Sequence, residues 1–140
     1  MDLALIFFLA GIIIVGGLLF AVVTKLSKTG TKKIDIEHFR AKCLEIEHQL
    51  KVDEPNSYHI TVLNFDKLLD QALKSRGARG KTMGERMKNS TSLFSDRNGV
   101  WTAHKLRNTI AHEPDAHVTY DQARRALYNF RKALKDLRVI

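Results

Sequence analysis

The stretch TYDQARRALYNFRKALKDL, residues 119–137, decides the fold class. Its apolar residues recur at alternating steps of four and three, the spacing that places side chains on one face of an α-helix. These residues are Ala123, Leu127, Phe130, Leu134 and Leu137. Thr119 and Gln122 have the spacing of a capping box, which satisfies free backbone amides at a helix start. The stretch therefore predicts an amphipathic helix with a defined beginning.

Two earlier segments show the same period. Within residues 34–51 and about 58–75 the apolar positions again recur every three or four residues. In the first they are Ile36, Phe39, Cys43, Ile46 and Leu50, and in the second Val62, Phe65, Leu69 and Leu73. Ser57 is the expected N-cap of the second helix, which should end before Gly77. Each segment predicts one core-facing helix.

Two further helices are expected before the last one. Thr82 and Glu85 have capping-box spacing and should open a short helix. The next helix should begin after Asn98-Gly99 and run to about Ala111, because Pro114 disfavours helical geometry at the residue before it. No segment alternates with a period of two. The fold class is therefore all-α, a bundle of four to five helices over residues 34–140.

The N-terminal segment has a different character. Residues 3–23, LALIFFLAGIIIVGGLLFAVV, carry no charge and would form about 31 Å of helix, enough to cross a bilayer. We expect a single transmembrane anchor over residues 1–24 and a basic juxtamembrane linker over residues 25–33. The lysines of that linker follow the span, so the positive-inside rule places the N-terminus outside and the C-terminal domain in the cytoplasm, at the inner or plasma membrane.

Charge and cysteine content limit the class of partner and site. The formal net charge of +8 favours an anionic partner such as nucleic acid or acidic lipid. The single cysteine, Cys43, allows neither an intrachain disulfide nor a thiolate zinc site, and its position on an apolar face indicates a buried thiol. None of the six histidines forms a metal-binding pair with a supporting carboxylate, so no metal or other cofactor is expected.

One segment looks like a phosphate-binding loop but is not one. In GARGKT, residues 77–82, the first glycine of the required G-x-x-x-x-G-K-T pattern would fall on Ser75. The segment also follows a predicted helix, whereas a phosphate-binding loop follows a strand. A nucleotide site of that type is therefore excluded.

The stretch KLRNTIAHEPD, residues 105–115, is the strongest candidate for chemistry. An arginine can bind phosphate oxygens through two N–H groups, and a histidine can take or give a proton near neutral pH. On a helix, Asn108 and His112 share a face with His104, whereas Arg107 lies about 140° from His112. One copy therefore does not direct the arginine and His112 at one atom, but two copies packed about a two-fold axis would. Such a site would supply base, acid and charge stabilisation without a metal.

The longer form of this motif is the informative one. For this composition, chance predicts about 0.4 instances of R-x4-H but only about 0.02 of R-N-x3-H. The sequence LRNTIAH resembles the R-polar-x3-H signature of the HEPN superfamily, a group of small helical domains found in prokaryotic toxins and RNA-targeting defence systems. The resemblance covers the helical domain and places the motif before the final helix. The wider stretch also looks like uncharacterised bacterial membrane proteins that carry such a domain.

The resemblance implies a function and a set of site residues. Catalytic members of the superfamily are metal-independent endoribonucleases that act as dimers and leave 2′,3′-cyclic phosphate ends. Arg107, Asn108 and His112 map onto their active-site residues. RNA would be guided by a further set of residues, namely Arg76, Arg79, Lys81, Arg86, Lys88 and His104. The expected partners are RNA, the membrane through residues 3–23 and a second copy of the chain, with a nucleotidyltransferase or another protein that restrains the nuclease.

Non-catalytic alternatives stay open. Some members of the superfamily only bind nucleotides or dimerise with a nucleotidyltransferase. The arginine, asparagine and histidine of the motif would then be a solvated helix face and a helix end. The chain would in that case be a helical adaptor or a nucleotide-binding module at the membrane.

Overall fold

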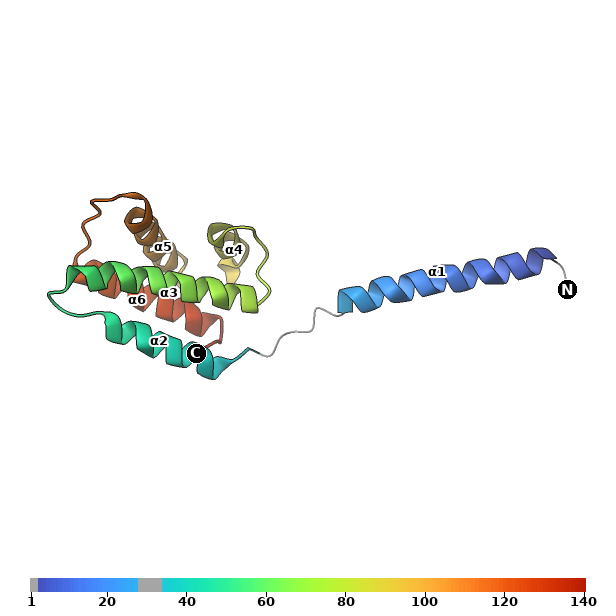
Figure 1. Cartoon of the computed structure of the whole chain (residues 1–140), viewed down its shortest axis with the longest axis horizontal. Helices are drawn as coiled ribbons and strands as arrows, with labels where there is room; N and C mark the ends of the chain where they lie inside the picture. The colour runs from blue at the N-terminus through green and yellow to red at the C-terminus, as the bar shows by residue number, and fades with distance from the viewer. Residues whose placement is uncertain (1–2, 28–33) are drawn as a thin grey trace. The chain divides into compact units, whose positions relative to one another are not determined.

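The computed structural model describes residues 3–27 and 34–140, which fall into two compact units, Met1–Lys33 and Ile34–Ile140 (Figure 1). The boundary lies where the sequence places the start of the helical domain. The described residues form helices and no strand, which confirms the all-helical class. Residues 28–33, most of the predicted basic linker, lie outside the described residues.

The first unit contains helix α1, Leu3–Ser27. The large apolar side chains of this helix over residues 7–23 are exposed. In the described part of the chain, no helix is both long enough and apolar enough to cross a membrane. The transmembrane anchor over residues 1–24 thus stays a prediction from the sequence.

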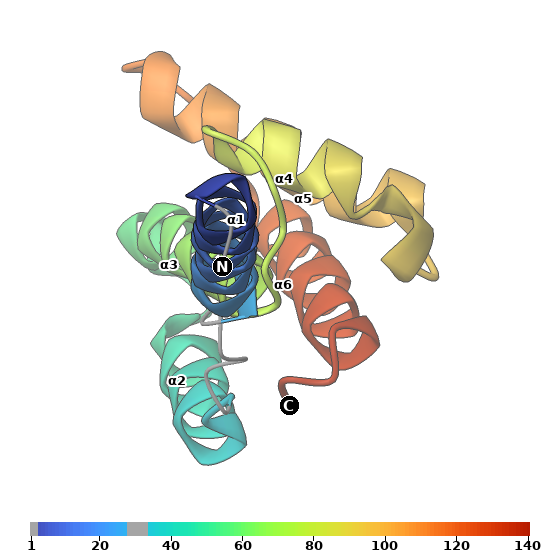
Figure 2. The ribbon, with the colours of Figure 1, turned by 90° about the vertical axis from the view of Figure 1, so that its right-hand side faces the viewer.

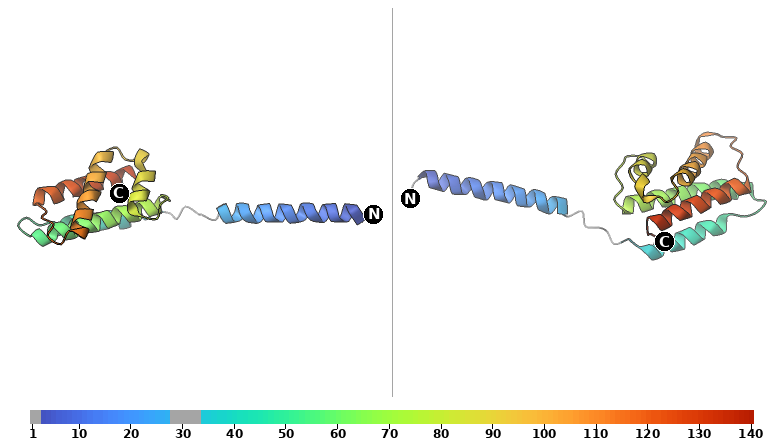
Figure 3. Two further views of the ribbon diagram at one scale, coloured as in Figure 1. Left: turned by 90° about the horizontal axis from the view of Figure 1, so that it is seen from above. Right: turned by 180° about the vertical axis from the view of Figure 1, so that it is seen from behind.

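The second unit is a bundle built around one central helix. Helix α3 packs against α2, α5 and α6, and α5 also packs against α6. Figures 2 and 3 show α2 on one side of the α3–α6 pair and α4 with α5 on the opposite side. The elements are α2 Ile36–Gln49, α3 Pro55–Ser75, α4 Met83–Asn89, the 3-10 turn η1 Thr91–Leu93, α5 Arg97–His112 and α6 Tyr120–Asp136.

The apolar stripes predicted from the sequence meet in the core of this bundle. Phe65 of α3 and Phe130 of α6 are fully buried and stack with their ring centroids 6.2 Å apart. Burying each large apolar side chain stabilises the fold by about 1.5–3 kcal/mol. One predicted stripe position is wrong: Ile36, in the first turn of α2, is 40% exposed.

Cys43 confirms the expected buried thiol. Its side chain lies in the core on α2 and forms no disulfide. Burial raises the pKa of this thiol to about 11, and the nearby Glu47 carboxylate adds to that rise, against the opposing charges of Arg131 and Lys135. The thiol is therefore protonated and unreactive at neutral pH.

Two helix ends follow the sequence closely. At the start of α6 the Thr119 hydroxyl accepts a hydrogen bond from the Gln122 backbone amide, and the Gln122 side chain accepts one from the Thr119 amide. This is the predicted capping box. Helix α5 ends at His112, and Glu113, before Pro114, adopts an extended conformation with φ −110° and ψ 109°. The proline therefore sets this boundary as expected.

Helix α3 begins earlier than predicted. Pro55 occupies its first turn, where the absence of a backbone N–H costs nothing, and Glu54 is the N-cap. Ser57, the predicted N-cap, instead accepts a hydrogen bond from the Lys51 backbone amide and donates one to the Lys51 carbonyl. Its hydroxyl thus closes the preceding loop.

Helix α5 starts earlier than predicted, whereas α4 starts at its predicted cap, Thr82. Asp96 caps α5 by accepting a hydrogen bond from the Gly99 amide, so the Asn98-Gly99 pair lies in the first turn and not before it. At α4 the Thr82 hydroxyl accepts from the Glu85 amide, but the Glu85 carboxylate takes the Lys81 amide. Only half of that predicted capping box forms.

Candidate functional site

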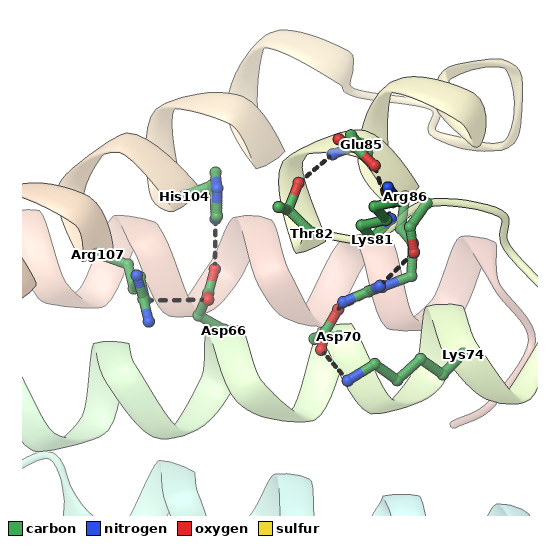
Figure 4. A network of polar contacts seen from close by, with 10 residues as sticks. Asp66, Asp70, Lys74, Lys81, Thr82, Glu85, Arg86, His104 and Arg107 are labelled. Atoms are coloured by element: carbon green, nitrogen blue, oxygen red, sulfur yellow. Dashed lines mark hydrogen bonds and ion pairs between the residues drawn. The ribbon is translucent and has the colours of Figure 1, made fainter.

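A polar cleft of about 630 Å³ opens between α3, α4 and α5. Its volume lies in the range of small-molecule sites. The polar residues that line it are Asn64, Asp66, Lys67, Asp70, Thr82, Arg86, His104, Arg107 and Asn108. Two carboxylates from α3 form its floor, and the side chains that meet them come from α4, from α5 and, in the case of Lys74, from α3 itself (Figure 4). The cleft therefore holds two charged networks side by side.

The first network centres on Asp66, which is only 4% exposed. One carboxylate oxygen, Oδ1, lies 2.8 Å from His104 Nδ1, and the other, Oδ2, lies 3.3 Å from Arg107 Nε (Figure 4). An ionised carboxylate can only accept hydrogen bonds, so Nδ1 of His104 carries the proton in this pair. The histidine is thus held with its other nitrogen, Nε2, available.

Nε2 of His104 is the unpaired ring nitrogen of a residue that is only 8% exposed. No residue in the described part of the chain forms a hydrogen bond with this atom, and no fully buried side-chain nitrogen or oxygen there lacks a partner. The atom therefore reaches solvent through a small part of its surface. A Cβ placed on Gly84 of α4 would lie 4.0 Å from Nε2. Gly84 thus lies beside this nitrogen and has no side chain to cover it.

Arg107 and Asn108 form a pair of donors beside this histidine. Arg107 Nη1 donates to Asn108 Oδ1 at 3.0 Å, which leaves the amide nitrogen Nδ2 of Asn108 as a donor. The arginine side chain is 35% exposed, and its Nη2 has no partner among residues 34–140. Together the guanidinium and the amide offer N–H groups suited to a phosphate oxygen.

The second network centres on Asp70, one turn further along α3. Arg86 Nε and Nη2 lie 2.8 and 2.7 Å from Asp70 Oδ1, and Arg86 Nη1 donates to the Gly80 carbonyl at 2.7 Å. Lys74 Nζ lies 2.6 Å from Asp70 Oδ2. Burial alone would raise the pKa of Asp70, but the hydrogen bonds and charges of Lys74 and Arg86 outweigh it and hold the pKa below its ordinary value.

Four of the nine predicted site residues line the cleft, Arg86 of α4 and three residues of α5, but His112 of α5 is not among them. His104, Arg107 and Asn108 line it, whereas His112 does not. His112 is the exposed last residue of α5, one turn beyond Asn108. The shared helix face expected for His104, Asn108 and His112 extends past the end of the cleft. In a single chain, therefore, His112 stands apart from the arginine of its own motif.

The five arginines and lysines predicted to guide RNA divide into two groups. Two of them, Arg86 and Arg76, are bonded within the domain, and the other three are exposed. Arg86 is buried in its ion pair, so it is not the exposed guide that the sequence suggests. The Arg76 guanidinium donates to the backbone carbonyls of Leu137 and Arg138 and ties the end of α3 to the end of α6. Three others are exposed but do not line the cleft, namely Arg79, Lys81 and Lys88.

The sequence prediction missed Asp66. This residue occupies a position on the apolar stripe that includes Val62, Leu69 and Leu73, at steps of four, three and four. A carboxylate on a core-facing stripe must be paired, because an isolated buried charge costs several kcal/mol. The aspartate on an apolar stripe was therefore the signal available in the sequence. The identity of its partners, 38 and 41 residues away along the chain, depends on how α5 crosses α3.

Comparison of this chain with protein-family models, curated proteins and solved structures finds no match. In the described part of the chain, no group of three or more histidine, cysteine, aspartate or glutamate side chains is placed to hold a metal ion. A function for this chain is therefore inferred from the geometry of the cleft.

Proposed function

We propose that this chain is a membrane-tethered, HEPN-like endoribonuclease that works without a metal and acts as a homodimer. The observation that supports it best is the placement of Arg107 and Asn108 beside the His104 imidazole in one polar cleft. The net charge of +8 adds an electrostatic attraction for RNA that needs no base sequence.

The proposed reaction is an internal transesterification. The ribose 2′-oxygen bonds to the adjacent phosphorus, the bond from phosphorus to the 5′-oxygen breaks, and a 2′,3′-cyclic phosphate and a free 5′-hydroxyl result. Arg107 stabilises the charge that develops on the phosphorane, and Asn108 orients a phosphate oxygen. His112 transfers a proton.

A dimer would explain why His112 lies outside the cleft of its own chain. This histidine lies at the end of α5, outside the cleft of its own chain. A second copy, packed about a two-fold axis, would bring its His112 to the cleft that holds Arg107. Under this proposal, mixing inactive Arg107→Gln protein with inactive His112→Ala protein restores part of the cleavage activity. Two chains that each work alone would give no recovery.

The membrane part of the proposal rests on the sequence. Residues 3–23 are uncharged and followed by lysines, so the helical domain would sit on the cytoplasmic face of the membrane. A nuclease in that compartment requires restraint, and a nucleotidyltransferase or another protein partner would supply it. Inaccessibility of the domain to protease in intact cells, with release by detergent, would support this placement.

The first test uses the full chain in detergent micelles with end-labelled RNA in EDTA. We expect cleavage with cyclic phosphate ends, lost on His112→Ala and retained on His48→Gln. His48 is a matched control, because it is an exposed helical histidine that lines no described cleft. Absence of cleavage by folded, dimeric parent protein over a broad RNA panel would reject the nuclease.

The second candidate is a nucleotide-binding adaptor without catalysis. The cleft volume and the free donors of Arg107 and Asn108 favour it, because both would suit a mononucleotide. It predicts that a nucleotide binds to the parent and to His112→Ala equally, that Arg107→Gln weakens binding, and that RNA stays intact in every case.

A further inference from the structure

The proposed cleavage needs two proton transfers, and the R-N-x3-H motif contains one histidine. A proton must leave the 2′-oxygen as it bonds to phosphorus, and a proton must reach the 5′-oxygen as its bond to phosphorus breaks. In an in-line reaction these two oxygens lie on opposite sides of the phosphorus. A single imidazole cannot contact both at once, so a second group is required.

The cleft holds a second histidine with the features of a general base. His104 donates from Nδ1 to the buried Asp66 carboxylate at 2.8 Å, which fixes the tautomer and leaves a lone pair on Nε2. Nε2 has no partner in the described part of the chain and lies beside Gly84, whose added Cβ would be 4.0 Å away. Arg107, which shares the same carboxylate, stands beside it.

We infer that His104, positioned by Asp66, is the general base that takes the proton from the 2′-hydroxyl of an RNA bound through Arg107 and Asn108. His112 is then the acid that gives its proton to the leaving 5′-oxygen. One proton is taken and one is given, so the protein ends the step with its total proton count unchanged. This inference rests on the proposed nuclease function and names the missing partner of the same site.

A purely packing role for His104 does not account for the geometry. Arg86 in the second network contacts partners through Nε, Nη1 and Nη2, whereas His104 has a partner at Nδ1 alone. His104 is paired on one side only and open on the side that lines the cleft. Asp66 contacts no substrate in this scheme and is a positioning residue.

The separation along α5 assigns the two histidines to different copies. His112 follows His104 by eight residues in chain order, which is about 12 Å of helix. This exceeds the span of a single phosphate and its two bridging oxygens. The base of one copy would therefore work with the acid of the other, in agreement with the dimer of the proposed function.

The test compares two substrates with the full chain in detergent and EDTA. One is a uridine-containing dinucleotide, whose alkoxide leaving group needs an acid, and the other is uridine 3′-(4-nitrophenyl phosphate), whose leaving group does not. We expect His104→Gln to lower kcat/KM at least about 100-fold on both substrates, as loss of a general base does. We expect His112→Ala to lower it on the dinucleotide and to recover most of the activity on the nitrophenyl ester.

Binding separates loss of chemistry from loss of folding. A 2′-deoxy oligonucleotide cannot be cleaved, and its affinity for His104→Gln should equal that for the parent. Gly84→Val offers a second route, because it places a branched side chain before Nε2 while leaving His104 and Asp66 in place. It should lower the rate of cleavage of both substrates. His48→Gln is again the control and should match the parent.

Three results would overturn the inference. Full activity of His104→Gln on the nitrophenyl ester would show that another group takes the proton. Rescue of His104→Gln, and not of His112→Ala, by the nitrophenyl ester would reverse the two roles. If the parent cleaves neither substrate, the proposed function itself fails, and the inference fails with it.

Discussion

Asp66 and Asp70 lie one helical turn apart on α3 and face the same cleft, yet their networks differ in what they leave unpaired. Arg86 gives Asp70 both Nε and Nη2 and uses Nη1 on the Gly80 carbonyl. Around Asp66, by contrast, His104 keeps one nitrogen free and Arg107 is partly exposed. Two similar carboxylates thus support different functions, because their partners are either fully engaged or only half engaged.

The difference teaches how to recognise a site within a charged cluster. A closed network such as that of Asp70 holds α4 and the residue 76–82 loop on α3 through Arg86, and only its edge, at Lys74, is exposed. An open network such as that of Asp66 orients groups toward solvent. Both networks contain a carboxylate and positively charged side chains, so charge does not distinguish them. The number of unpaired donors and acceptors does.

The largest expected effect is on stability, at the closed network. Asp70→Ala leaves the Arg86 charge buried without its partner and should lower the free energy of unfolding by about 3 kcal/mol. Urea denaturation followed by circular dichroism measures this. Asp66→Asn, which still accepts from His104 Nδ1, should cost less. An equal loss for the two variants would remove the distinction between the networks.

The next effect is on binding, at the open network. Arg107→Gln removes the charge and the free N–H groups that would contact phosphate, so affinity for a 2′-deoxy oligonucleotide should fall by about 2 kcal/mol, roughly thirtyfold. Fluorescence anisotropy measures it. The free energy of unfolding should change by less than about 1 kcal/mol, because the ion pair with Asp66 is partly exposed. A large loss of stability would place Arg107 with the closed network.

The loop that holds Arg86 provides a smaller test. Gly80 has φ 148°, and an added Cβ would lie 2.7 Å from the Arg86 backbone nitrogen. Gly80→Ala should therefore cost about 1–2 kcal/mol of stability by thermal denaturation. Gly77→Ala is the matched control, since it has φ 75° but no atom near its Cβ. We expect Gly77→Ala to cost less.

Acid should weaken the closed network selectively. The pKa of Asp70 is lower in the folded protein than in the unfolded chain, so its contribution to stability is fully present above the ordinary aspartate pKa of about 3.9. That contribution is lost as the pH falls through the lower, folded-state value. Asp70→Asn should thus show a shallower decline of stability between about pH 4 and pH 2 than the parent. Parallel curves would contradict the assignment.

The smallest expected effect is at the exposed edge of the closed network. The Lys74 side chain is 56% exposed and pairs with Asp70 from one turn along the same helix. Lys74→Met should change the free energy of unfolding by about 0.5 kcal/mol or less, and salt should reduce the change further. A change as large as that of Asp70→Ala would mean that Lys74 and Arg86 hold Asp70 equally.

The fold was largely predictable because its signals are local. The stripe of α6, the capping box at Thr119 and the stop before Pro114 each depend on residues within one helical turn or two. The start of α3 was misplaced because Pro55 and Ser57 both suit a helix start, and the choice between them depends on the bond from Ser57 to Lys51.

The candidate site was predictable only in part. The motif on α5 supplied Arg107 and Asn108, and the helical period added His104 one turn before them. Asp66 and the burial of Arg86 depend on the packing of α3 against α4 and α5, contacts that link residues far apart in the chain. No local pattern distinguishes a lysine or arginine that will be buried from one that will be exposed.

The shared carboxylate of Asp66 restricts how this protein can change during evolution. A substitution there acts at once on the hydrogen bond to His104, the ion pair with Arg107 and the packing beneath the cleft. The Asp70 and Arg86 pair is less constrained, since replacing both residues together by apolar residues of similar size can keep or raise stability. Random libraries screened for folding alone should therefore accept paired replacements at residues 70 and 86, whereas selection for activity should keep residue 66 as aspartate.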